Sequence, residues 1–213
     1  MAARKQRFWK SLRMHEGRIV SDRDKSPWTV GEWREVAAPV RECEGLNCCE
    51  SIIDAMRYVN MEVLAEVEID GVRIDGDDKI TVQRMRIIKA WRWTREDFIS
   101  LTAFGLKLYL ECLEKEGVLD KAHTKKEIET ARAFIENPTY ENMLAALTAL
   151  FGGHWAAASF AGRFGWGLYN AASYVDSGVG ARVAFSKIRA DFFKRSHQWI
   201  VKRTKEMEAL QCT

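Results

Sequence analysis

The chain has 213 residues, of which 47% are hydrophobic and 30% charged, and only three are proline. This composition excludes an intrinsically disordered protein, because disordered chains lack the apolar residues needed to build a core. The length predicts one large domain or two small ones. A net charge of +3 also excludes the strongly acidic proteins that imitate DNA.

Positive charge is concentrated near the two ends of the chain. Residues 1–25 hold eight basic residues against three acidic ones, and residues 182–205 hold eight against one. Such segments can attract nucleic acid or an acidic protein surface. They can equally be solvated faces with no partner, and the sequence leaves both interpretations open.

In the first 93 residues the hydrophobic pattern is mainly that of strands. Residues 1–26 read as an arm or a first strand, and residues 27–40 as a short extended segment with a turn at Gly31. A helix capped by Ser51 is expected to run to about Val59. Alternation then predicts strands over 62–69, 72–74 and 80–91, with a two-residue hairpin turn at Asp70-Gly71 and a second turn at 76–78.

After Trp93 the apolar period changes from 2 to about 3.6, which is typical of helices. Helices are predicted over residues 94–116, 124–137, 139–152, 154–174 and 179–210. The expected fold class is therefore α+β, with a small antiparallel β-sheet and a short helix in the N-terminal half and five helices in the C-terminal half. We expect a β-rich domain over 1–93 and a helical domain over 94–213.

Five cysteines, an odd number, and no recognisable export signal favour free thiols in a reducing compartment, so we expect a cytoplasmic protein. Cys43, Cys48 and Cys49 lack a neighbouring Cys or His pair with zinc-site spacing, and no metal is expected. The uncharged stretch 142–162 is rich in Ala and Gly, which favours packed helices over a membrane span.

No phosphate-binding loop and no nucleophile elbow occurs in the sequence, so it predicts no cofactor and gives no direct sign of catalysis. The four histidines are scattered along the chain. The acidic residues of 62–68 read most simply as the polar face of a strand.

The segment from Trp28 to Trp91 resembles a domain family that recurs in phage and prophage proteins of unassigned function. The resemblance is carried by Trp-Thr-Val-Gly-Glu-Trp at 28–33, Glu-Cys-Glu-Gly-Leu-Asn-Cys-Cys at 42–49, Asp-Ala-Met-Arg-Tyr at 54–58, Val-Glu-Ile-Asp-Gly at 67–71 and Asp-Asp-Lys at 77–79. An alanine-rich helical tail, like that of residues 140–174, often follows in this family. The resemblance implies a protein of a mobile element.

Part of the same pattern is similar to the core of ADP-ribosyltransferases, in which a glycine-containing turn precedes a helix that ends in an aromatic residue. That similarity implies NAD as a ligand, with Asn47, Tyr58, Glu66 and Glu68 as the residues that would bind it. Asn47 stands where the phage family usually has histidine, and asparagine is a poor acid–base group.

Three functions remain open. The first is a phage-encoded accessory protein that binds a host or defence complex, the class that includes inhibitors of CRISPR complexes. The second is a degenerate ADP-ribosyltransferase-like NAD-binding protein, and the third is a nucleic-acid-binding protein that uses the basic ends. Trp, Tyr and Arg are enriched at the hot spots of protein interfaces. The candidate partner-binding residues are Trp9, Arg13, Trp28, Trp33, Arg189, Lys194, Arg195, Lys202 and Arg203.

Overall fold

The computed structural model describes residues 6–56, 61–115, 117, 119–151 and 182–209, and only the backbone at 121, 122, 151, 182–190 and 192. The chain divides into two compact units. The first, the sheet unit, comprises residues 1–93 and 201–213, and the second, the helical unit, comprises residues 94–200. The predicted α+β class is confirmed, because the N-terminal half forms an antiparallel sheet and the C-terminal half is helical.

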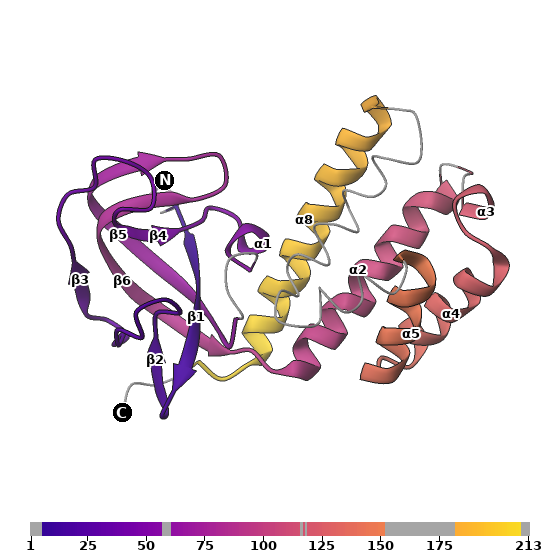
Figure 1. The fold of residues 1–213 in the computed structure, drawn as a ribbon, viewed down its shortest axis with the longest axis horizontal. Coiled ribbons are helices and arrows are strands. Elements are labelled where there is room, and N and C mark those ends of the chain that lie inside the picture. Colours follow the sequence, from indigo (N-terminus) through magenta and orange to yellow (C-terminus); the bar gives the residue numbers. More distant parts are fainter. Residues whose placement is uncertain (1–5, 57–60, 116, 118, 152–181, 210–213) are drawn as a thin grey trace. The chain divides into compact units, whose positions relative to one another are not determined.

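The sheet unit is built on a long curved hairpin of two strands, β5 and β6 (Figure 1). Its strands are β1 (Phe8–His15), β2 (Arg18–Val20), β3 (Trp33–Glu35), β4 (Leu46–Cys48), β5 (Val63–Asp75) and β6 (Ile80–Arg92). They pair in the order β2-β1-β5-β6-β3, and β4 pairs with another part of β6. All of these pairs are antiparallel.

Backbone pairing closes part of the sheet on itself. Cys49, directly after β4, exchanges two hydrogen bonds of 2.8 Å with Trp9 on β1. Because β1 also pairs with β5, β5 with β6 and β6 with β4, these four strands form a closed ring, called the strand ring below. A second crossing lies between β2 and β6, where Trp28 pairs with Ile19 and Gly31 donates to the carbonyl oxygen of Ile87.

The inner face of the strand ring forms the core of the sheet unit. Alternate residues of each strand point inward, as the period of 2 requires. The core includes Phe8, Leu12, Trp28, Leu46, Cys48, Val63, Val67, Val82, Met85 and Ile87. Helix α1 (Ile52–Ala55) lies beside β1, and Ser11 donates a hydrogen bond of 2.5 Å to the carbonyl oxygen of Ala55. Ser51 caps α1 as predicted, although the helix ends four residues earlier than expected.

The predicted hairpin turn at Asp70-Gly71 is wrong. β5 runs without interruption from Val63 to Asp75, and the pairing with β6 shifts its register between Asp70 and Arg73. Gly71 has the positive φ of 76° that was expected, but this φ serves a β-bulge instead of a turn. The chain reverses at Gly76, whose N–H donates to the carbonyl oxygen of Lys79.

The helical unit follows the predicted caps closely. Its helices are α2 (Arg95–Lys115), α3 (Leu119–Ala122), α4 (Lys125–Glu136), α5 (Tyr140–Phe151) and the part of α8 (Arg182–Glu206) up to Ile200. Thr124 and Glu127 form the predicted capping box of α4, and α2 ends before Gly117, whose φ is 65°. The short α3 was not expected, and the predicted helix over 154–174 lies outside the described residues.

A chain of polar side chains joins α2 to the start of α4. The Tyr109 hydroxyl lies 2.8 Å from Nε2 of His123, and Nδ1 of His123 lies 3.5 Å from the Glu127 carboxylate. The same carboxylate accepts the N–H of Thr124 in the capping box. Burial lowers the pKa of His123 and outweighs the opposite effect of Glu127, so the imidazole is kept neutral.

We expect replacement of Gly45, next to β4, to destabilise the sheet unit. A Cβ at Gly45 would lie 2.7 Å from the backbone oxygen of Val82, which cannot move without disturbing the β4–β6 pairing. Gly45→Ala should lower the free energy of unfolding by about 1–3 kcal/mol, as measured by urea denaturation. Gly76→Ala is the matched control, because its Cβ would meet only the flexible end of Glu42. Equal effects of the two changes would contradict this account.

Stability should also fall as the pH is lowered through about 6.5, the ordinary pKa of histidine. Because the folded pKa of His123 is lower than that value, the unfolded chain binds a proton there more readily than the native chain does. The urea midpoint, followed by helical circular dichroism between pH 7.5 and about pH 5, should decrease. His123→Gln should reduce this slope, and an unchanged slope would contradict the role given to His123. His197, whose pKa is also lowered by burial, accounts for a remaining slope.

Candidate functional site

A lysine occupies an inward-facing position of the strand ring. Along β1, Phe8 and Leu12 belong to the core, Met14 packs against it, and Lys10 shares their face because side chains alternate. The half-buried Lys10 amine donates a hydrogen bond of 2.7 Å to the backbone oxygen of Asn47 on β4. Lysines are rarely placed inside a core unless they are paired with an opposite charge, and an inward-facing lysine that also lines a pocket is a candidate functional residue, so Lys10 marks the candidate site.

An aromatic ring and a second cation face this lysine. Nζ of Lys10 lies 5.3 Å from the centroid of the Trp28 ring, and the guanidinium carbon of Arg34 lies 5.0 Å from the same centroid. The ring is held in place because its Nε1–H donates to Ser21 at 2.8 Å, and only 6% of Trp28 is exposed. Arg34 also lies 3.6 Å from the Asp24 carboxylate. Both cations therefore lie near one fixed indole ring.

These residues line a pocket of about 600 Å³ between β1, the turn after β2, β3 and β4. We call it the Lys10 pocket. Its charged lining residues are Lys10, Arg23, Arg34 and Lys79, together with Asp22 and Asp24. Four cations against two carboxylates make the pocket attractive to an acidic group.

The pocket changes the acid–base properties of its lining. Burial lowers the pKa of Lys10 to about 8, and the charge of Arg34 adds to this effect. Burial raises the pKa of the Cys48 thiol to about 12 and also raises the pKa of Cys49. Near neutral pH, most Lys10 side chains are therefore charged and a minority carry a neutral amine, while these two thiols stay protonated.

The rim of the pocket is held by a short hydrogen-bond chain. Buried Thr81 donates to the side-chain oxygen of Asn47 at 2.8 Å and accepts the backbone N–H of Cys43 at 2.9 Å. The Asn47 side chain is therefore occupied in fixing β4 against β6. Its backbone oxygen is the group that faces the lysine.

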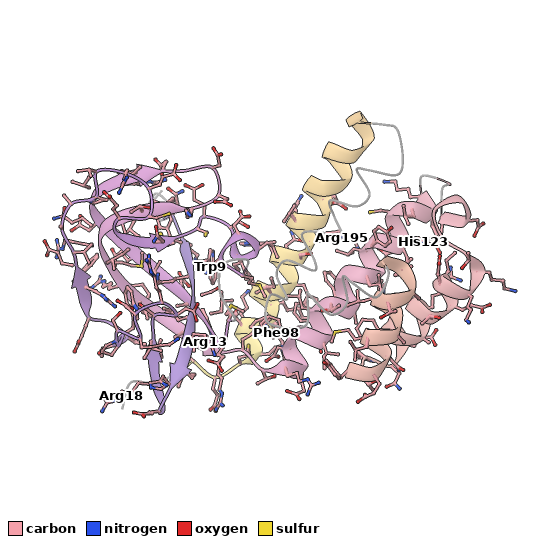
Figure 2. The ribbon with its side chains drawn as sticks, viewed as in Figure 1. Trp9, Arg13, Arg18, Phe98, His123 and Arg195 are labelled. Atoms are coloured by element: carbon pink, nitrogen blue, oxygen red, sulfur yellow. The ribbon has the colours of Figure 1, made fainter. Side chains whose placement is uncertain are left out.

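The aromatic partner-binding candidates separate in the structure. Trp28 and Trp9 both line the Lys10 pocket. Trp9, on β1 (Figure 2), is only 2% exposed, and its ring centroid lies 6.3 Å from that of Trp91. Trp33 is 37% exposed, and the guanidinium groups of Arg84 and Arg86 lie over its ring at 4.9 and 4.8 Å.

Several basic candidates are already paired with carboxylates. Arg13 lies 2.9 Å from Glu62 and 3.3 Å from Asp22. Arg195, on α8, lies 3.0 Å from Glu111 on α2 (Figure 2). Arg203 lies 3.4 Å from Glu206 within α8. Lys194 and Lys202 are exposed, and the side chain of Arg189 lies outside the described part of the chain.

The three described residues of the NAD-binding hypothesis line two separate sites. Asn47 lines the Lys10 pocket, whereas Glu66 and Glu68 line a separate groove with Arg7 and Arg86. Glu66 lies 3.4 Å from Arg7, and Glu68 accepts two hydrogen bonds from Arg86. Tyr58 lies outside the described residues.

Sequence reasoning missed Lys10 and Arg34 as site residues. A signal for Lys10 was present, because Phe8, Lys10, Leu12 and Met14 form an alternating series in which one member is charged. Arg34 carried no comparable signal, since β3 has only three residues.

The described ranges contain no group of three His, Cys, Asp or Glu side chains placed to hold a metal ion. Cys43, Cys48, Cys49 and Cys112 are free thiols, and Cys212 lies outside the described part. No helix among the described residues has the length and apolar character needed to cross a bilayer.

A family model described as a domain of unknown function, DUF7666, matches residues 15–100, from the end of β1 into α2. The matched range includes Trp28, Arg34 and Asn47 but not Lys10. Searches of curated proteins and of solved structures find no match.

We expect Lys10 to lower the stability of the fold in which it lies. Burial lowers the pKa of Lys10 from 10.5 to about 8, which means that the folded protein disfavours the charged amine. At pH 7 Lys10 is still mostly charged, so the fold bears this free-energy cost. Lys10→Met should therefore raise the free energy of unfolding by about 1–3 kcal/mol, because one pKa unit corresponds to about 1.4 kcal/mol and the lost contacts offset part of the gain. Urea denaturation at pH 7 measures this change.

The matched control is Lys89→Met, at an exposed position of β6, which should change stability by less than about 0.5 kcal/mol. The stabilisation by Lys10→Met should shrink as the pH rises from about 8 towards 10.5, where native Lys10 no longer carries its charge. A loss of stability in Lys10→Met at pH 7 would show that the amine supports the fold.

Proposed function

We propose that this protein acts by binding, and that the Lys10 pocket receives an acidic side chain of a partner protein. The observation that carries the proposal is the pair of cations, Lys10 and Arg34, beside one fixed Trp28 ring in a pocket. The proposal also includes what the sequence resemblance led us to expect, namely a phage-encoded protein whose partner belongs to a host or defence complex.

The chemistry of the two cations supports a carboxylate ligand. An ammonium has three N–H donors, and within the described residues Lys10 uses one of them, on the Asn47 backbone oxygen. A guanidinium presents a planar set of donors that fits a carboxylate. Hydrogen bonds between charged groups in a partly desolvated pocket contribute about 1.5–3 kcal/mol each.

The other two hypotheses have less support. The nucleic-acid hypothesis relies on basic ends in which Arg13, Arg195 and Arg203 lie 2.9, 3.0 and 3.4 Å from carboxylates. These pairs are closer than the 3.6 Å that separates Arg34 from Asp24. Of the described residues of the NAD-binding hypothesis, Asn47 lines one site and Glu66 and Glu68 line another.

The test is a titration of the ¹⁵N-labelled protein with a glutamate-rich peptide, followed through the indole N–H resonance of Trp28. We expect a saturable shift with a Kd on the order of 0.1–1 mM, as two charge-assisted contacts allow. Arg34→Met should weaken binding about tenfold or more, and Lys89→Met should leave it unchanged. Binding should weaken as the pH rises through about 8, because Lys10 loses its proton.

A single-stranded oligonucleotide and a lysine-rich peptide serve as competing probes. A response to the oligonucleotide alone would contradict the proposal and favour nucleic acid as the partner. An equal response to both peptides would also contradict it, because the pocket would not be selecting for negative charge.

A further inference from the structure

We infer that Lys10 is a nucleophilic lysine that forms a reversible imine with a small carbonyl compound bearing a carboxylate. This inference rests on the same pocket as the proposed function, but it uses the neutral amine instead of the ammonium. The ligand class is that of aldehyde acids and 2-oxo acids, in which the carbonyl and the carboxylate are close together.

The pocket provides the two groups that such a ligand needs. Nζ of Lys10 and the guanidinium carbon of Arg34 each lie within 5.3 Å of one ring centroid, so they are at most about 10 Å apart. Within this limit, a carbonyl carbon at Lys10 and a carboxylate at Arg34 can belong to one short oxo acid or aldehyde acid. The pocket volume of about 600 Å³ has room for a ligand of this size.

The surroundings of Lys10 are those that make an amine nucleophilic. Lysines become reactive when they are desolvated or placed beside another cation, and Lys10 meets both conditions. The backbone oxygen of Asn47, 2.7 Å away, orients the amine on β1. The neighbouring thiol of Cys48 stays protonated, so it does not compete for the carbonyl.

The reaction balances without an oxidant or reductant. The lone pair of the neutral amine forms a bond to the carbonyl carbon, and a proton moves from nitrogen to oxygen to give a carbinolamine. The C–O bond then breaks, water leaves with that oxygen, and a C=N bond forms. Hydrolysis reverses the sequence and returns the free amine and the carbonyl compound.

The test is reductive trapping of the full chain with glyoxylate and cyanoborohydride, which converts the imine into a stable secondary amine. Peptide mapping by mass spectrometry then compares Lys10 with exposed Lys89. An amine with a pKa of about 8 is neutral about 300 times more often at pH 7 than one at 10.5, although its lower basicity makes it less nucleophilic. We expect Lys10 to be labelled about tenfold more than Lys89.

The ratio of Lys10 to Lys89 labelling should fall as the pH rises through about 8, because Lys10 is then already neutral. This ratio cancels the pH dependence of the reductant. Lys10→Arg should abolish the preferred labelling, Lys89→Arg should leave it intact, and Arg34→Met should reduce it.

Labelling of Lys10 at or below the level of Lys89 would overturn the inference. The proposed function would survive that result if the glutamate-rich peptide still shifts the Trp28 resonance. Lys10→Arg separates the two further, because it retains a cation for the carboxylate but has no amine that can form an imine. Loss of the peptide response with labelling preserved would instead overturn the proposed function alone.

Discussion

Both edges of β1 are paired at the same point, since Trp9 pairs with Cys49 on one side and with Glu66 on the other. A strand held on both edges cannot rotate or slip by one residue without turning its side chains to the opposite face. The inward direction of Phe8, Lys10 and Leu12 is therefore fixed by backbone hydrogen bonds. The pairing that directs Phe8 and Leu12 into the core also directs the Lys10 ammonium inward, at a cost in folding free energy. The position of Lys10 in the pocket follows from this pairing.

Two neighbouring groups offset part of the free-energy cost of burying the Lys10 ammonium. The Asn47 oxygen accepts a hydrogen bond from its amine, and the Trp28 ring offers a π-face. Neither contact neutralises the charge, and Arg34 adds a second cation nearby. A site of this kind costs stability and is expected where function requires it. Binding of a carboxylate and formation of an imine are two ways in which one amine can use the same environment, and protonation selects between them.

Much of the fold could be predicted because the relevant signals are local. The Thr124–Glu127 capping box and the alternation of β6 each depend on a few neighbouring residues. The closure of the strand ring could not be predicted, because β2, β3 and β4 have three residues each and their pairing is with distant segments. Asp70-Gly71 misled the prediction because a glycine with positive φ suits a bulge as well as a turn. The candidate site depends on that closure, so among its lining residues the sequence predicted only Trp9, Trp28 and Asn47.

The cysteines beside the pocket have a consequence for redox chemistry and for labelling. Cys48 belongs to the inner core, both it and Cys49 are buried, and burial raises the pKa of each thiol. Thiols that seldom ionise react slowly with oxidants and alkylating reagents, so the strand ring should keep its structure under mild oxidation. Cys43, in contrast, is exposed and lines the mouth of the pocket. A fluorophore attached there would sense the occupancy of the cavity directly, and natural thiol modification at this position would alter access to it.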